Sequence, residues 1–228
     1  MTEAKVVLFD LDGTLLRTGG AGRRAMDQAL REVGLADGLG TMRLDGMTDR
    51  AIVREAAVAH QLGCDVTFID AVLARYLVLL EGNIAACAEA EYVVLPGVAD
   101  AVRALRERGL AVGLGTGNVE PGARIKLARS GLNAHLPFGG FGSDAEDRAE
   151  LLAAGVRRAE ELLGLSLDPE SVWIVGDTPK DVTAGKRIGA KVLAVATGHY
   201  SVDALVGTGA DIVVPDLAHP DAWRDLGL

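Results

Sequence analysis

Residues 6–14 read VVLFDLDGT, a run of four β-prone apolar residues followed by a turn that carries Asp10 and Asp12. An unbroken apolar run of this kind is typical of a strand buried on both faces, as in a parallel sheet. The turn places two carboxylates directly after that strand. The segment therefore predicts a parallel sheet with acidic groups at the end of one of its strands.

Outward from this strand, the second half of the chain alternates between helical and strand-like patterns. Helices are predicted at 98–108, 120–130, 147–163 and 179–188, strands at 110–115, 172–175, 191–195 and 211–214, and a loop rich in Gly and Phe at 136–143. Strands that alternate with helices of about 10–15 residues indicate βαβ units. The predicted fold class is therefore α/β, with a parallel sheet.

Between residues 20 and 91 the pattern changes to apolar residues at three- and four-residue intervals, which is typical of amphipathic helices. Helices are predicted at 21–33, 48–61 and 66–89. Because the first strand belongs with the later strands, this helical block interrupts the α/β layer. We expect a core domain made of residues 1–18 and 93–228 and a helical domain at 19–92.

Polar side chains follow three of the predicted strands. They are Asp10 and Asp12, then Thr116 and Asn118, then Asp177 and Asp181. Ligands of open parallel sheets bind at the carboxyl ends of the strands, so we expect these groups to converge. Four carboxylates in one place repel each other unless a cation neutralises them, and Mg²⁺ combines carboxylates with a substrate phosphate. Asp and Gly also favour turns, so it is the three turns together that predict a site for metal and phosphate.

Three motifs resemble those of the haloacid dehalogenase (HAD) superfamily. Residues 10–15, DLDGTL, resemble its first motif, Thr116 after an apolar strand resembles its second, and residues 176–181, GDTPKD, resemble its fourth. Their order and spacing match over almost the whole chain. The resemblance implies a Rossmann-like, HAD-like core with an inserted α-helical cap of the C1 type, as in phosphoglycolate phosphatase-like members.

The resemblance also implies a mechanism. Asp10 would attack phosphorus and form an aspartyl-phosphate, and Asp12 would protonate the leaving alkoxide and then deprotonate the hydrolytic water. Mg²⁺ would be bound by Asp10, the backbone carbonyl of Asp12 and Asp177, with Asp181 either a direct ligand or one step removed. We therefore expect Mg²⁺ as the cofactor.

The resemblance assigns phosphate binding to the Thr116 hydroxyl and the backbone amides of Gly117 and Asn118. The third motif of the family is normally a Lys, and no Lys lies between Lys126 and the fourth motif. Arg148, at the start of a predicted helix, is the best substitute, because Arg binds phosphate bidentately and stays charged. A solvated Arg on an amphipathic helix is the alternative interpretation, and Lys126 is a poorer candidate for the role.

Two features favour a phosphatase within the family. A dehalogenase lacks the second Asp of the first motif, whereas Asp12 is present, and a phosphonatase needs a cap Lys, whereas residues 20–91 contain none. We expect Mg²⁺-dependent hydrolysis of a small organic phosphate monoester, with phosphoglycolate as the first candidate. Thr48 or Arg50 would contact the substrate, although an ordinary helix start explains both equally well. A β-phosphoglucomutase-like phosphomutase and a catalytically silent HAD-fold binding protein are the alternatives.

Composition narrows the expected partners and surroundings. The chain of 228 residues has a net charge of −9, which argues against nucleic acid or an anionic membrane as a partner. No stretch approaches the roughly 18 apolar residues of a membrane span. We therefore expect a cytoplasmic monomer or homodimer whose partner is a small phosphorylated metabolite.

Overall fold

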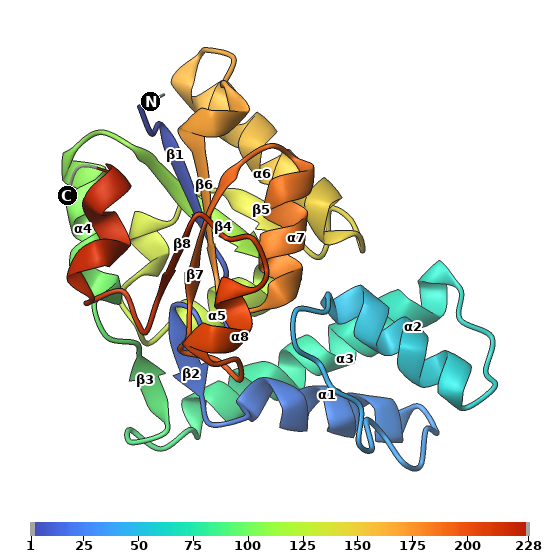
Figure 1. The fold of residues 1–228 in the computed structure, drawn as a ribbon. Coiled ribbons are helices and arrows are strands. Elements are labelled where there is room, and N and C mark those ends of the chain that lie inside the picture. Colours follow the sequence, from blue (N-terminus) through green and yellow to red (C-terminus); the bar gives the residue numbers. More distant parts are fainter. Residues whose placement is uncertain (1–2, 227–228) are drawn as a thin grey trace.

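The computed structural model describes residues 3–226 and contains a six-stranded parallel sheet in the order β5-β4-β1-β6-β7-β8 (Figure 1). The strands are β1 (Val6–Phe9), β4 (Ala111–Thr116), β5 (Gly139–Phe141), β6 (Val172–Gly176), β7 (Lys191–Val195) and β8 (Ile212–Val214). β1 lies between β4 and β6, with Leu8 opposite Gly113 on one side and Ile174 on the other. The first strand of the chain is therefore central in the sheet, and the predicted α/β class is confirmed.

Helices cover both faces of this sheet. They are α4 (Val98–Glu107), α5 (Glu120–Leu127), α6 (Arg148–Leu163), α7 (Pro179–Arg187) and the short α8 (Val202–Val206). Val7 and Phe9 belong to one apolar cluster with residues of α4 and α5, whereas Val6 and Leu8 belong to a second cluster with residues of α6 and α7. Figure 1 shows α4 and α6 on opposite sides of the sheet. Because the side chains of a strand alternate between faces, both faces of β1 are buried, which explains its unbroken apolar run.

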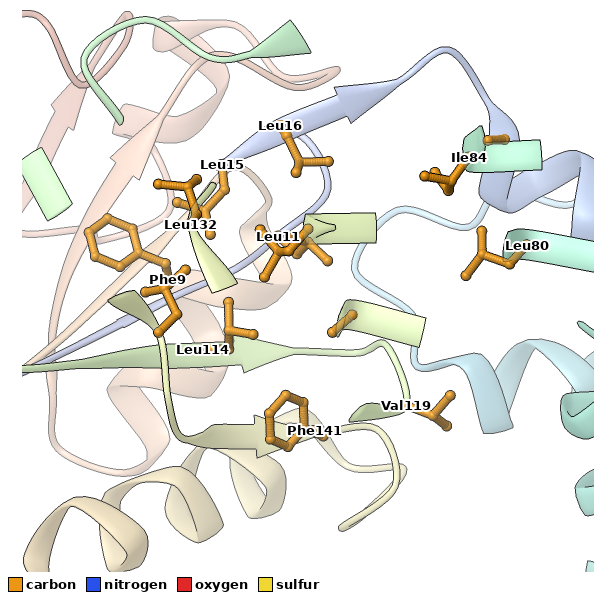
Figure 2. Packing of buried hydrophobic residues seen from close by; sticks show 14 of the residues in the cluster. Phe9, Leu11, Leu15, Leu16, Leu80, Ile84, Leu114, Val119, Leu132 and Phe141 are labelled. Atoms are coloured by element: carbon orange, nitrogen blue, oxygen red, sulfur yellow. The ribbon is translucent and has the colours of Figure 1, made fainter. Parts of the chain in front are cut away.

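A helical insertion, residues 19–91, separates β1 from the rest of the sheet. It contains α1 (Ala21–Glu32), α2 (Asp49–Ala59) and α3 (Val66–Ala85), and its connections to the sheet pair as an antiparallel ribbon of β2 (Leu16–Thr18) and β3 (Tyr92–Val94). Figure 1 shows the three helices together at one end of the sheet. One apolar cluster runs from Phe9 and Leu11 to Leu80 and Ile84 of α3, as Figure 2 shows. The insertion thus shares a core with one face of the sheet.

The structure differs from the prediction in its shortest elements. The stretch 136–143, predicted as a loop, contains β5, and the prediction omits β2, β3 and α8. β5 reads GGF, which has little intrinsic preference for a strand. A Cβ on Gly140 would lie 1.8 Å from the carbonyl oxygen of Leu151 in α6, so glycine is needed for the helix to pack closely on this strand. Tertiary packing therefore overrides the local propensity.

The ribbon of β2 and β3 marks where the helical insertion begins and ends, and α3 ends at Ala85, four residues before the end of the helix predicted at 66–89. Tyr92, predicted as the last residue of the helical domain, is the first residue of β3. The division of the chain into two domains stays a prediction. Within residues 3–226, none of the helices is both long enough and apolar enough to cross a membrane.

Candidate active site

The carboxyl ends of β4, β1 and β6 bring predicted site residues to one cavity. Asp10 follows β1, Thr116 ends β4 and Asp177 follows β6, and all three line a cavity of about 940 Å³. The helical insertion supplies another wall, which includes Met26 of α1 and Tyr76 of α3. The strand ends therefore converge as expected, and both parts of the chain enclose the space in front of them.

The carboxylates of Asp10, Asp177 and Asp181 form a buried cluster at these strand ends. Each offers an oxygen within 4.8 Å of the others. Burial raises the pKa of Asp10 to about 6, against the attraction of Arg148 and with repulsion from Asp181 and Asp12. Burial and repulsion from Asp10 and Asp181 raise the pKa of Asp177 to about 8. Asp177 therefore holds a proton at neutral pH unless a cation replaces it, and the hard oxygen donors suit a hard divalent cation such as Mg²⁺.

Two glycines let the backbone approach Asp177 closely. A Cβ on Gly198 would lie 1.7 Å from Oδ2 of Asp177, and one on Gly13, whose φ is +85°, would lie 2.6 Å from the same oxygen. The other oxygen, Oδ1, accepts a hydrogen bond from the Thr14 hydroxyl at 3.1 Å. Asp177 is thus fixed through Oδ1, while Oδ2 packs against the backbone of Gly13 and Gly198.

Arg148 is the first residue of α6, and its guanidinium reaches the carboxylate cluster. Nε donates to Oδ1 of Asp181 at 2.7 Å, and Nη2 lies 2.5 Å from the same oxygen and 3.0 Å from Oδ1 of Asp10. Within residues 3–226, Nη2 has no partner in hydrogen-bond geometry. Burial lowers the pKa of Arg148, but Asp181 and Asp10 together raise it well above its ordinary value. The buried side chain therefore keeps its charge and has donor capacity left beside Asp10.

Asp181 fixes this arginine from the other side. Its Oδ2 accepts hydrogen bonds from the backbone N–H and the hydroxyl of Thr178, at 3.0 and 2.7 Å. The same two residues form the capping box that begins α7. Because Oδ1 faces Arg148, both oxygens of Asp181 are engaged by the chain itself.

Asp12 receives two donors on one oxygen. Lys126 Nζ lies 2.6 Å from Oδ2 of Asp12, and Asn118 Nδ2 lies 2.9 Å from it. Asn118 Nδ2 also donates to the Thr116 hydroxyl at 2.8 Å. The polar residues after β4 are therefore connected to the carboxylate after β1.

The two cations that were candidates for the third motif occupy different places. Arg148 lies beside Asp10, whereas Lys126 of α5 lies beside Asp12. The contact between Lys126 and Asp12 was not predicted from the sequence. The available signal is that Lys126 follows the buried Ala123 by three residues, which places it on the inner face of α5.

The helical insertion contacts the loop after β4 through Asp49, the first residue of α2. The Asp49 N–H donates to the Gly117 carbonyl at 2.8 Å, and Asp49 Oδ2 accepts from the Val119 N–H at 2.9 Å. Burial raises the pKa of Asp49 to about 6, against the attraction of Lys126. A Cβ on Gly117 would lie 2.2 Å from the carbonyl oxygen of Met47, so this glycine permits the close contact.

The predicted substrate contacts Thr48 and Arg50 flank Asp49 and have other partners. Thr48 caps α2 by accepting from the Ala51 N–H at 3.2 Å, and Arg50 forms an ion pair with Asp70 at 2.8 Å. Among the described residues that line the cavity, α2 contributes Asp49 rather than either neighbour. Successive residues of a helix point in directions about 100° apart, so a residue next to Asp49 in the sequence need not face the cavity.

Residues 4–189 match the haloacid dehalogenase-like hydrolase family. The chain belongs to this family. A phosphoglycolate phosphatase of Rhodospirillum rubrum is 32% identical, over 96% of this chain and 90% of its own. A phosphoglycolate phosphatase of Pseudomonas putida is 27% identical, over 95% of this chain and 78% of its own. The family and these relatives identify the chain as a phosphatase, that is, a phosphoric monoester hydrolase.

Solved structures share the fold over its full length. CbbY from Rhodobacter sphaeroides, in complex with phosphate, matches with a TM-score of 0.75 and 17% identity, over 99% of this chain and 100% of its own. A hydrolase from Pseudomonas syringae matches with a TM-score of 0.68 and 19% identity, over 95% of both chains. These matches confirm the expected HAD-like fold.

Proposed function

We propose that this phosphatase hydrolyses a small phosphate monoester of the phosphoglycolate class, with Mg²⁺ as cofactor and through an aspartyl-phosphate on Asp10. The observation that carries the proposal is the buried pair of Asp10 and Asp177 with Arg148 held beside it. This charge pattern suits a phosphoryl group that meets a divalent cation on one side and a guanidinium on the other. The similarity to the Rhodospirillum rubrum phosphoglycolate phosphatase supports the substrate class.

The carboxylates of Asp10 and Asp177 fit Mg²⁺, and the family resemblance implies the backbone carbonyl of Asp12 as a third ligand. The fit rests on the raised pKa of both carboxyls, since a cation relieves the repulsion that otherwise keeps protons there. Asp181 is better suited to hold Arg148 than to bind the ion, because both of its oxygens are engaged. When bound, Mg²⁺ supplies charge neutralisation and orientation of the phosphoryl group.

The residues of the chain carry the reaction in two steps. Asp10 attacks phosphorus in line, so that the bond to the leaving oxygen breaks as the aspartyl-phosphate forms. Asp12 gives its proton to the leaving alkoxide and later takes one from the water that hydrolyses the aspartyl-phosphate. The groups that hold the phosphoryl oxygens in both steps are the Thr116 hydroxyl, the amides of Gly117 and Asn118, and Arg148.

The helical insertion selects the substrate in this proposal, because the strand-end residues bind only the phosphate. We assign residues 1–18 and 93–228 to the catalytic core and 19–92 to a cap of the C1 type. Met26 and Tyr76 of the insertion line the cavity opposite the strand ends and are available to the organic part of the ester. Contact between insertion and core limits substrate size and excludes bulk water.

Phosphate release from phosphoglycolate and from p-nitrophenyl phosphate tests the proposal. Both should be hydrolysed with Mg²⁺ and not with EDTA, and Asp10→Asn should release phosphate from neither. Mass spectrometry of wild type quenched in acid should detect the phosphorylated Asp10. Release that persists in Asp10→Asn would contradict the mechanism. A well-folded wild type inactive on both esters would contradict the function, and phosphate transfer from a sugar bisphosphate would then be measured.

A further inference from the structure

We propose that Lys126 is a positioning residue for Asp12. Together with Asn118 it binds Oδ2 of the Asp12 carboxylate, which leaves Oδ1 to exchange protons with the leaving group and with water. The inference rests on the function proposed above, in which Asp12 is the general acid and base. It adds to the site a residue of α5 that lies outside the motifs of the family.

The two donors on Asp12 meet on the same oxygen. Lys126 Nζ is 2.6 Å and Asn118 Nδ2 is 2.9 Å from Oδ2, and within residues 3–226 no hydrogen-bond donor reaches Oδ1. Rotation of this carboxylate about its Cβ–Cγ bond breaks both hydrogen bonds at once. Oδ1 of Asp12 is therefore held in one orientation, and efficient proton transfer requires a fixed orientation of this kind.

Lys126 is itself held in place along its length. Its side chain is 7% exposed, and its backbone carbonyl accepts from the Tyr92 hydroxyl at 2.6 Å. A Cβ on Gly22 of α1 would lie 3.1 Å from both Cε and Nζ of Lys126, so the end of the side chain packs against the backbone of α1. Fixing a free lysine side chain costs rotamer entropy. Packing has already removed that freedom here, so the ammonium is preorganised for Asp12.

Asp12 has little else to hold its side chain. It is 45% exposed and lies in the turn after β1, in contrast to the buried carboxylate cluster beside it. Asn118 divides its Nδ2 between Asp12 and Thr116, whereas Lys126 makes the shorter contact and carries a positive charge. The ammonium forms an ion pair with Asp12, which the neutral amide of Asn118 cannot do. Loss of the Lys126 ammonium should therefore release Asp12 while the phosphate-binding groups stay in place.

Substrates with different leaving groups test this role. Phosphoglycolate needs a proton on its leaving oxygen, whereas p-nitrophenolate leaves without one. In Lys126→Met, kcat/KM for phosphoglycolate should fall about 10²-fold, and kcat/KM for p-nitrophenyl phosphate should change less than about threefold. Lys126→Gln keeps a donor without the charge and should recover part of the loss. Lys186→Met, the same change at a more exposed lysine paired with Asp211, is the matched control.

A second comparison asks whether Lys126 acts through Asp12. In the Asp12→Asn background, Lys126→Met should cause no further loss of kcat/KM for phosphoglycolate, because residues that act as one unit are not additive. Equal losses on the two esters, no loss on either, or an additive loss in the double variant would overturn the role. Should Lys126→Met not fold, Lys126→Gln carries the same comparisons. A wild type inactive on both esters would instead overturn the proposed function.

Discussion

Arg148 of α6 donates from Nε to Oδ1 of Asp181 in α7 across 2.7 Å, although the two residues are 33 positions apart in the chain. Thr178 engages the other oxygen of Asp181, so the carboxylate that orients the arginine is itself fixed by the first turn of α7. Nη2 of the same arginine lies 3.0 Å from Asp10. The direction of the guanidinium is therefore set by a carboxylate that need not touch the substrate.

Arg148→Met should abolish activity and destabilise the protein. Asp10 and Asp181 would lose their buried cation, and removing one partner of a buried ion pair costs about 3–5 kcal/mol. The loss should be smaller at pH 5 than at pH 8, because buried carboxyls without a cation take up protons instead. Denaturant unfolding at the two pH values measures this. Arg148→Lys keeps the positive charge but loses the planar guanidinium, and it should retain more stability than Arg148→Met. Equal stability of the two variants at pH 8 would contradict the ion-pair argument.

Gly198→Ala should weaken metal binding. The new Cβ would lie 1.7 Å from Oδ2 of Asp177, so the carboxylate or the backbone has to move. Displacing the surroundings of a metal ligand typically costs about 10–100-fold in affinity, and we expect a loss of this size in the Mg²⁺ dependence of activity. Gly207→Ala is the control, since nothing lies within 4 Å of its Cβ. An unchanged Mg²⁺ dependence in Gly198→Ala would argue against Asp177 as a ligand.

Mg²⁺ should raise the melting temperature more at pH 8 than at pH 6. The pKa of Asp177 is about 8 and that of Asp10 about 6 in the protein without metal. Below pH 8 the ion has to displace a proton from Asp177, so its apparent affinity should fall by up to about tenfold per pH unit. Thermal unfolding at a fixed Mg²⁺ concentration, with EDTA as the baseline, measures the shift at each pH. A shift independent of pH, or one that survives in Asp177→Asn, would be evidence against this site.

Asp49→Asn should stabilise the protein above pH 6 and leave its stability unchanged below pH 4. The folded-state pKa of Asp49 is about 6, against an ordinary value of 3.8. Between these values the folded state binds more protons than the unfolded state, so wild-type stability falls as pH rises through this window. The gain in the Asn variant above pH 6 should be on the order of 3 kcal/mol.

Urea unfolding at pH 4 and pH 7.5 checks the Asp49 prediction. An Asn oxygen can still accept from the Val119 N–H, so the hydrogen bond between the insertion and the loop after β4 should survive. Asp49→Ala is the comparison in which that hydrogen bond is lost. A difference between Asn variant and wild type that is the same at both pH values would show that titration of Asp49 is not its cause.

The strand-end part of the site could be predicted because it follows from topology. Once the apolar run at 6–9 identifies a doubly buried strand, the parallel sheet brings the carboxyl ends of its neighbours together. Asp10, Thr116 and Asp177 then meet without any knowledge of side-chain contacts. Arg148 was predicted differently, as the substitute for the Lys that the family resemblance implies, and it is the first residue of α6.

The remaining contacts depend on how helices are rotated, which the sequence specifies weakly. Lys126 and Asp12 are 114 positions apart, and their contact requires one particular face of α5 to be turned inward. In the same way, the orientation of α2 selects Asp49 for the cavity over its neighbours Thr48 and Arg50. Apolar periodicity locates the ends of a helix to within about two to four residues. It does not fix which side chain meets a given neighbour, because successive residues point about 100° apart.

The two chain crossings between the sheet and the helical insertion are paired with each other, with Arg17 of β2 opposite Val93 of β3. Two independent linkers would let the insertion slide and twist over the strand ends. In a paired ribbon, sliding one strand along the other breaks its ladder of hydrogen bonds, whereas bending keeps it. Bending of the ribbon is therefore the way in which insertion and sheet can separate without loss of these hydrogen bonds.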